Sequence, residues 1–459
     1  TRYAIQDPKT YLYCPVYMTP STWEFKYKRP SISGSLKIYE AHIGMSSEEE
    51  KVSSFTEFKN KVLPKIRDLG YNCIQLMGIA EHAYYGSFGY QVTNHFAVSS
   101  RFGSIEEFKN LVDDAHSSGI AVIMDIVLAH TSPNCDDGLG NMDGSSDLYF
   151  YPGEKGYQRS WDTYIFDYSK LEVLRFLLSN VRFWMQEYFL DGFRFDGVTS
   201  LMYDHHGINF SFTGNYREYF NDQLNTDGMA FLMFANYFMK QIFAESISIA
   251  EDVSGFPGSS MALVEGGLGF DYRLNMAAPD VWIKYFKDRR VDDWDLNYLV
   301  SVLKNCRYGE KIINYCESHD QAIVGDKTIS MHLFNEQIYT HFNVCNEETP
   351  KIFLGISLHK MSRLLTLCLG HAYLNFMGNE FGHPEWIDFP REGNKNSYRF
   401  CRRQWSLATN SDLRYKFLLN WECRMQELES GFQIMKNCTK IHYWINESDK
   451  VLTLESDKF

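Results

Sequence analysis

The chain has 459 residues, of which 44 % are hydrophobic and 22 % charged, and its formal net charge is −13. These proportions are typical of a globular protein and exclude a disordered, collagenous or coiled-coil chain, and the negative charge makes nucleic acid and anionic membrane surfaces unexpected partners. Phe, Tyr and Trp make up 16 % of the residues, more than core packing alone requires, which indicates a surface where rings stack on a flat ligand.

Strand-like and helical patterns alternate along the chain. A strand-like run at 36–43 is followed by apolar residues at helical spacing over 55–69, and Gly70 marks the end of that predicted helix. The same unit recurs, so that eight alternating β and α units predict a closed parallel (β/α)8 (TIM) barrel. The further strands are predicted at 73–79, 121–130, 191–198, 246–253, 269–275, 311–320 and 371–381, and further helices at 105–116, 171–189, 229–243, 294–306, 358–369 and 413–428.

Two long insertions interrupt this pattern. Residues 131–168, rich in Asp, Gly, Ser and aromatic residues, are predicted to form a loop after the third strand, and 202–227 form another after the fourth. The active site of such a barrel is built from the loops that follow the strands, so both insertions are expected at the working face. Residues 440–456 predict a β hairpin that turns at 446–450.

The sequence also indicates the compartment. No stretch of about 18 uncharged apolar residues occurs, so no membrane span is predicted, and the first residues lack a leader pattern and an initiating Met, so both ends are expected to be truncated. The ten cysteines lie far apart without a Cys-x-x-Cys pair, as expected of free thiols in a reducing cytosol.

Charged and polar side chains end four of the predicted strands. A single Asp after a strand is usually a helix cap, but four such clusters at equivalent heights would bring like charges into one pocket, which is costly and rarely kept for packing. Glycosidic cleavage needs that arrangement, with one carboxylate as nucleophile, a second as protonated acid and partners that orient them. The clusters contain Asp125, His130, Arg194, Asp196, Glu251, Asp252, Glu317, His319 and Asp320.

The segments that contain these residues resemble a known family. DIVLAH (125–130), GFRFDGVTS (192–200), IAEDVSG (249–255) and ESHDQ (317–321) look like the four signature regions of the α-amylase clan of retaining glycoside hydrolases and transglycosylases. Segments across nearly the whole chain resemble the eukaryotic glycogen and starch branching enzymes, among them IYEAHIG (38–44), EHAYYGSFGYQVTN (81–94) and NFMGNEFGHPEW (375–386).

The resemblance implies a transglycosylase that cleaves α-1,4-glucan chains through a covalent glucosyl-enzyme and transfers them to a 6-hydroxyl, forming α-1,6 branches in glycogen or starch. In this interpretation Asp196 is the nucleophile, Glu251 the general acid and then base, and Asp320 the stabiliser of the transition state. Two alternatives stay open: an α-amylase-like retaining hydrolase, and a catalytically silent glucan-binding protein, which would be expected to lack at least one of these carboxylates.

The resemblance also implies substrate-binding roles for five residues around the catalytic carboxylates. Tyr90 would stack beneath the −1 glucose, and His130 and His319 would donate hydrogen bonds to it. Arg194, on the same strand face as Asp196, would keep that carboxylate ionised, and Asp125 would order the Arg and His side chains.

Neither a metal nor a cofactor is expected. The acidic run in 136–147 lacks the regular oxygen spacing of a calcium loop, so a solvated turn is favoured, and a loop or core role is favoured for His82, His95 and the pair at 205–206. The expected partner is an α-glucan polysaccharide, with no nucleic acid and no membrane, and a monomer is one option for the oligomeric state. The expected compartment is the cytoplasm, or the plastid in a plant or alga.

The resemblance further implies three parts. Residues 1–33 would be a remnant or linker from an N-terminal β-sandwich carbohydrate-binding module, 34–430 the catalytic barrel with its insertion at about 131–168, and 431–459 the start of a C-terminal all-β domain. The fold expected is thus a (β/α)8 barrel with long βα-loop insertions, flanked by partial β-sandwich domains.

Two details concern the working face. Ala129 precedes His130 where amylases usually carry Asn and many branching enzymes Ser, so a hydrogen bond from position 129 is expected to be lost. Five loop aromatics, besides Tyr90, are expected at this face: Tyr84, Tyr85, Phe150, Tyr151 and Trp161.

Overall fold

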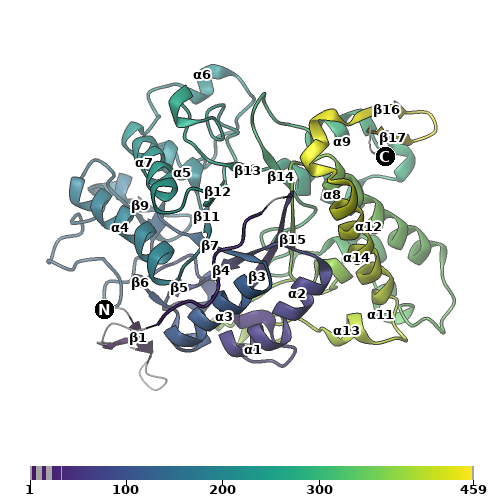
Figure 1. Ribbon diagram of the computed structural model, residues 1–459, viewed down its shortest axis with the longest axis horizontal. Coiled ribbons are helices and arrows are strands. Elements are labelled where there is room, and N and C mark those ends of the chain that lie inside the picture. The colour runs from purple at the N-terminus through teal and green to yellow at the C-terminus, as the bar shows by residue number, and fades with distance from the viewer. Residues whose placement is uncertain (1–2, 7–12, 17–22, 33, 457–459) are drawn as a thin grey trace.

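A closed barrel of eight parallel strands forms the centre of the computed structural model, which describes residues 3–6, 13–16, 23–32 and 34–456 (Figure 1). Neighbouring strands follow one another around the barrel in chain order, and each predicted strand-like run contains one of them, so the prediction of a (β/α)8 barrel is confirmed. The strands are β3 (Leu36–His42), β4 (Cys73–Met77), β7 (Ala121–Ile126), β11 (Gly192–Phe195), β12 (Ile247–Ala250), β13 (Tyr272–Leu274), β14 (Ile312–Asn314) and β15 (Ala372–Phe376).

Helices surround the barrel (Figure 1). They are α1 (Phe55–Lys61), α2 (Leu63–Leu69), α3 (Ile105–Ser117), α4 (Leu171–Glu187), α5 (Val198–Met202), α6 (Tyr216–Tyr219), α7 (Thr226–Ile242), α8 (Ala277–Asp288), α9 (Leu296–Leu303), α10 (Ile329–Phe334), α11 (Gln337–Thr340), α12 (Pro350–Cys368), α13 (Ser406–Thr409) and α14 (Tyr415–Phe432).

Two predicted helices differ from those observed. The single helix expected over 55–69 is two helices that meet at Val62, because Pro64 stands in the first turn of α2, where its missing N–H costs nothing. Helix α12 begins at Pro350, eight residues before the predicted start at 358, and the side chain of Thr349 caps it by accepting a hydrogen bond from the amide of Ile352.

The insertions carry secondary structure that the sequence pattern did not indicate. The segment 131–168, predicted to be a loop, contributes with His130 a three-stranded antiparallel sheet in the order β8 (His130–Thr131), β10 (Thr163–Ile165), β9 (Tyr157–Gln158). Strands of two or three residues are too short to produce a recognisable alternation. The second insertion contains α6. Outside both insertions, β5 (Ala80–Glu81) pairs with β6 (Asn94–Val98) in the loop region after β4.

Two hairpins lie outside the barrel. The predicted hairpin near the end of the chain is present as β16 (His442–Asn446) and β17 (Val451–Glu455), which pair antiparallel. Strands β1 (Tyr3–Gln6) and β2 (Tyr13–Val16) form a second antiparallel pair, within the residues 1–33 that the resemblance assigns to a remnant or linker of an N-terminal β-sandwich module. No helix in the described ranges is long and apolar enough to span a bilayer.

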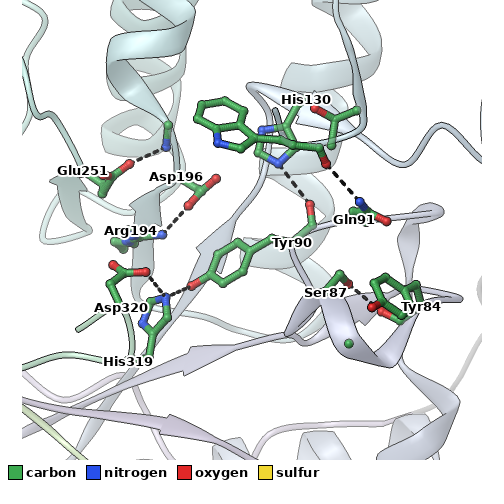
Figure 2. A pocket seen from close by; sticks show the side chains of 14 residues that line it. Tyr84, Ser87, Tyr90, Gln91, His130, Arg194, Asp196, Glu251, His319 and Asp320 are labelled. Carbon is green, nitrogen blue, oxygen red and sulfur yellow. Dashed lines mark hydrogen bonds and ion pairs between the residues drawn. The ribbon is translucent and has the colours of Figure 1, made fainter. Parts of the chain in front are cut away.

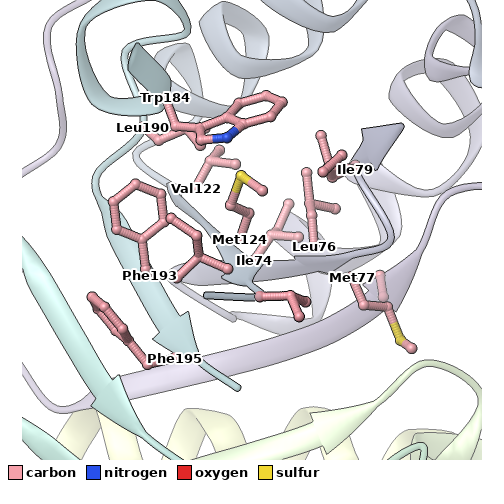
Figure 3. Packing of buried hydrophobic residues seen from close by; sticks show 14 of the residues in the cluster. Ile74, Leu76, Met77, Ile79, Val122, Met124, Trp184, Leu190, Phe193 and Phe195 are labelled. Atoms are coloured by element: carbon pink, nitrogen blue, oxygen red, sulfur yellow. The ribbon is translucent and has the colours of Figure 1, made fainter. Parts of the chain in front are cut away.

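The side chains of the barrel strands alternate between two apolar layers. Ile74, Leu76, Val122 and Met124 pack outward beneath Trp184 of α4, as Figure 3 shows. The intervening residues fill the interior of the barrel in a separate cluster that includes Leu36, Ile38, Cys73, Ala121, Ile123 and Ile249.

Near the carboxyl ends of the strands, the next inward-facing position holds a polar residue instead of an apolar one. In β3 the inward series is Leu36, Ile38, Glu40, and in β7 it is Ala121, Ile123, Asp125. In the register of the sheet, Glu40 lies beside Gln75 and Asp125 beside Arg194. The barrel therefore ends in a polar layer above its apolar interior.

Candidate active site

A pocket of about 400 Å³ opens above this polar layer. It is lined by seven of the eight predicted site residues, which the structure brings together from five segments far apart in the sequence (Figure 2). These are Tyr90, His130, Arg194, Asp196, Glu251, His319 and Asp320. Asp125 does not line the pocket: its side chain is 4 % exposed and lies behind Tyr90 and Arg194.

Two of the carboxylates are held by an extension of the barrel ladder. The amide of Asp196 donates to the carbonyl of Ile126 at 3.2 Å, and the amide of Glu251 donates to that of Phe195 at 3.1 Å. Gly197, which directly follows Asp196, has φ +64°, and its amide donates to Glu251 Oε2 at 2.7 Å. This left-handed glycine turns the chain directly after Asp196, and its amide holds the Glu251 carboxylate at the pocket.

Ala129 packs against that turn. It is buried, and a Cβ placed on Gly197 would lie only 3.1 Å from the Ala129 Cβ. The Ala129 carbonyl accepts a hydrogen bond from the Tyr168 hydroxyl at 3.1 Å. At this position the chain thus offers a close apolar contact.

Arg194 neutralises the carboxylates beside it. Its Nη1 lies 2.7 Å from Asp196 Oδ1 and 3.3 Å from Asp125 Oδ2, and the side chain is almost fully buried. Burial alone would lower the pKa of Arg194, but Asp125, Tyr90 and Asp196 outweigh it and raise that pKa well above its usual value. A permanent positive charge therefore stands at Asp196.

The pKa values of the other two carboxyl groups in the pocket, Glu251 and Asp320, are shifted in opposite directions. Burial raises the pKa of Glu251 to about 7, and the nearby charges of Asp196 and Asp320 add to this effect against Arg194. Burial also acts to raise the pKa of Asp320, but the charge and hydrogen bond of His319, 3.1 Å away, outweigh it and bring the pKa to about 2. Near neutral pH the pocket thus combines a carboxylic acid with an ionised carboxylate, as acid-assisted cleavage of an acetal requires.

Tyr90 is fixed by a network behind the pocket. Its hydroxyl donates to Asp125 Oδ2 at 2.6 Å and lies 2.9 Å from His319 Nε2, and the two rings are nearly parallel with centroids 5.4 Å apart. Burial raises the pKa of Asp125 to about 6, partly opposed by Arg194. His319 in turn contacts Glu40, a buried residue to which the sequence analysis gave no role.

His130 contacts the Tyr90 main chain. Its Nε2 lies 3.1 Å from the carbonyl oxygen of Tyr90, and burial lowers the pKa of the imidazole, so the ring is neutral at pH 7. A neutral ring has one proton, and here Nε2 donates it to that carbonyl. As placed, His130 positions the backbone of Tyr90; its donation to a sugar stays a prediction.

The loop aromatics divide between the pocket and the core. Tyr84 and Trp161 line the pocket rim with exposed fractions of 48 % and 39 %. The expectation was wrong for Tyr85 and Phe150, which are buried in the core, and Tyr151 packs against that core. Loop membership does not determine which rings face outward: Tyr85 packs against Phe389, and Phe150 stacks on Tyr164 of the small sheet in the insertion.

Further pocket residues were not predicted. Ser87, Gln91 and Thr163 also line the wall, and Gln91 Nε2 donates to the main-chain carbonyl of Trp161 at 3.1 Å, joining the two sides of the rim. Gln91 directly follows Tyr90 in the segment 81–94, and this neighbourhood was the one signal in the sequence that could have placed Gln91 at the pocket. Among the described residues, no three His, Cys, Asp or Glu side chains gather as metal ligands would.

Comparisons with known proteins identify relatives of this chain. A model of the alpha-amylase catalytic domain matches residues 60–155. The chain is 50 % identical to a 1,4-alpha-glucan-branching enzyme of Solanum tuberosum, over 99 % of this chain and 54 % of that protein. It is 53 % identical to the enzyme of the same name from Felis catus, over 89 % of this chain and 58 % of the relative. The chain thus spans about half to three-fifths of these two relatives.

Solved structures share the fold at low identity. An alpha-amylase from Lactobacillus plantarum superimposes with a TM-score of 0.61 at 18 % identity, covering 91 % of this chain and 85 % of that one. The catalytic module of the glycogen-degrading pneumococcal protein SpuA superimposes with a TM-score of 0.68 at 14 % identity, covering 95 % of this chain and 70 % of that one. At this identity the likeness concerns the fold alone.

Proposed function

We propose that this chain, which belongs by sequence to the family of the 1,4-α-glucan-branching enzymes, cleaves an α-1,4-linked glucan and transfers the released segment to a 6-hydroxyl, creating an α-1,6 branch. The observation that carries the proposal is the pocket in which Asp196 beside Arg194, Glu251 with its raised pKa and Asp320 with its lowered pKa converge. The identity of about 50 % to plant, fungal and animal relatives of that name supports the same reaction.

The first step uses Asp196 and Glu251 together. An Asp196 oxygen attacks the anomeric carbon of the −1 glucose while Glu251 gives its proton to the leaving glycosidic oxygen, which departs as the 4-hydroxyl of the chain that is left behind. The Arg194 guanidinium, 2.7 Å from Asp196 Oδ1, pairs its positive charge with the nucleophile. The product is a glucosyl ester of Asp196.

The second step reverses these roles. Glu251, now a carboxylate, accepts the proton of a 6-hydroxyl on an acceptor chain, whose oxygen attacks the anomeric carbon and releases Asp196. Asp320 stabilises the oxocarbenium-like transition states with its negative charge, and the Tyr90 ring supports the sugar.

The remaining features of the proposal concern partners and surroundings. The substrate is an α-glucan such as glycogen or starch, and the barrel at 34–430 carries the chemistry, with the hairpins in 1–33 and 431–459 belonging to flanking β domains. The compartment is a reducing one, cytoplasm or plastid, in keeping with the nine free cysteines among the described residues.

The test is incubation of the protein with amylose, followed by iodine colour, reducing ends and chains released by isoamylase. Branching predicts loss of colour and new isoamylase-sensitive linkages with few new reducing ends. Reducing ends that rise in step with the loss of colour, without such linkages, would favour the hydrolase. If neither changes, the glucan-binding alternative holds.

A further inference from the structure

Glu40 is a carboxylate that supports the pocket without lining it. It lies at the carboxyl end of β3 and is 2 % exposed. Its Oε1 accepts hydrogen bonds from His319 Nδ1 at 2.7 Å and from Gln75 Nε2 at 3.2 Å, and its Oε2 accepts from the His319 amide at 3.2 Å. One side chain of the first barrel strand thus holds both the ring and the main chain of a residue that follows the seventh.

Both ring nitrogens of His319 face hydrogen-bond acceptors. Nδ1 faces the Glu40 carboxylate, while Nε2 faces Asp320 Oδ1 at 3.1 Å and the Tyr90 hydroxyl oxygen at 2.9 Å. The Tyr90 proton is directed to Asp125 Oδ2 at 2.6 Å, so this hydroxyl can only accept from His319. A neutral imidazole has one N–H and would leave one of these acceptors facing a lone pair, whereas the imidazolium satisfies both.

The charges around His319 come from several elements of the barrel. Glu40 on β3, Asp125 on β7 and Asp320 are acidic, His42 on β3 is a base, and Phe376 of β15 lies against the ring. Arg194 on β11 is bonded to Asp125. Burial would lower the pKa of His319, but Asp320 and Glu40 outweigh it and raise that pKa well above 6.5.

We propose that Glu40 is a positioning residue for the reaction: it keeps His319 doubly protonated and fixed, so that His319 can hold Asp320 ionised and oriented toward the sugar. This inference rests on the proposed function. Glu40 acts through His319 and touches no reacting atom.

A direct test follows the His319 ring by NMR in protein labelled with ¹⁵N-histidine, with the signal assigned by its loss in His319→Gln. In the parent protein both ring nitrogens are expected to stay protonated well above pH 6.5, and in Glu40→Gln the pKa of His319 is expected to fall by about 1 to 3 units. A parent ring that is neutral at pH 7, or an unchanged titration in the variant, would overturn the proposal. This measurement needs no enzymatic activity, and the titration of the parent does not depend on whether Glu40→Gln folds.

A double-mutant cycle then tests whether Glu40 acts through His319. Glu40→Gln is expected to lower kcat for branching about 10- to 100-fold in the parent, with little change in KM, and to have almost no further effect in the His319→Gln background. The alkaline limb of the pH profile, which Glu251 sets at about pH 7 in the parent, should also become steeper or move to lower pH, because His319 now loses its proton in the same range. Equal losses in both backgrounds would contradict the proposal.

Glu310→Gln is the matched control. Glu310 is also a buried carboxylate, paired with Arg273 at 2.8 Å, but it lies before β14, at the opposite end of the barrel strands from the pocket. This variant is expected to lose stability while keeping the pH profile of the parent. If the parent makes no branches at all, the proposed function fails, whereas the NMR titration still decides the role of Glu40.

Discussion

Replacing Glu251 by Gln removes the proposed general acid with little change in shape. Burial and the neighbouring carboxylates raise the pKa of Glu251 to about 7, so the group carries a proton to deliver at neutral pH. The amide of Gln can still accept the hydrogen bond that the Gly197 amide donates at 2.7 Å, but it cannot give up a proton. Loss of a general acid costs about 10²- to 10⁴-fold in rate, or about 3 to 5 kcal/mol of transition-state stabilisation.

The assay compares kcat/KM for amylose and for α-glucosyl fluoride, because departing fluoride needs no proton. Glu251→Gln is expected to lose the full factor on amylose and to keep most of its rate of glucosyl-enzyme formation from the fluoride. The acid form is the active one, so kcat/KM of the parent on amylose should fall by about tenfold per pH unit above about 7, and this limb should vanish in the variant. Equal losses on both substrates, or a retained limb, would refute the assignment of Glu251 as the acid.

Three further variants test other parts of the account. Asp196→Ala should lower the rates of branching and of fluoride turnover alike by about 10⁴-fold or more, since no ester can form. If this variant forms products at the parental rate, the assignment of Asp196 as the nucleophile is wrong. Gly89→Ala should lower both the stability in urea and kcat/KM. The φ angle of Gly89 is +98°, and a Cβ there would lie 2.2 Å from Gly78 Cα and displace the loop that contains Tyr90. Parental values of both quantities would show that this close approach is unimportant. Glu422→Gln should lower the free energy of unfolding by about 3 to 5 kcal/mol, because the buried Arg363 loses its carboxylate partner. KM should stay unchanged. A urea titration that shows no loss of stability would disprove that the ion pair matters.

The barrel was predictable because its strands are short apolar runs buried on both faces and separated by helical periodicity. The boundaries were less so: the run 121–130 reads as one strand, yet β7 ends at Ile126 and His130 belongs to the small sheet of the insertion. The interruption depends on pairing with Tyr164 and Ile165, more than thirty residues later. Local pattern contains no information about such contacts.

The site was predictable to a similar degree. That Asp196, Glu251 and Asp320 converge follows from their places after parallel strands, because the carboxyl ends of those strands meet at one face of the barrel. That Asp125 lies behind the wall depends on which side chains reach past it, and the contact of Glu40 with His319 joins residues 279 positions apart. The inward series Leu36, Ile38, Glu40 was nevertheless a usable signal for Glu40.

The claim that Asp196 attacks the sugar can be measured directly by trapping the ester. A 5-fluoro-α-glucosyl fluoride enters the first step without an acid, and its added fluorine destabilises the transition state of release, so that the intermediate accumulates in Glu251→Gln. Mass spectrometry of the intact protein and of its peptides is expected to find one fluoroglucosyl group on the peptide that contains Asp196. A label on another residue, or turnover of the fluoride without any covalent adduct, would contradict the double displacement proposed for this pocket.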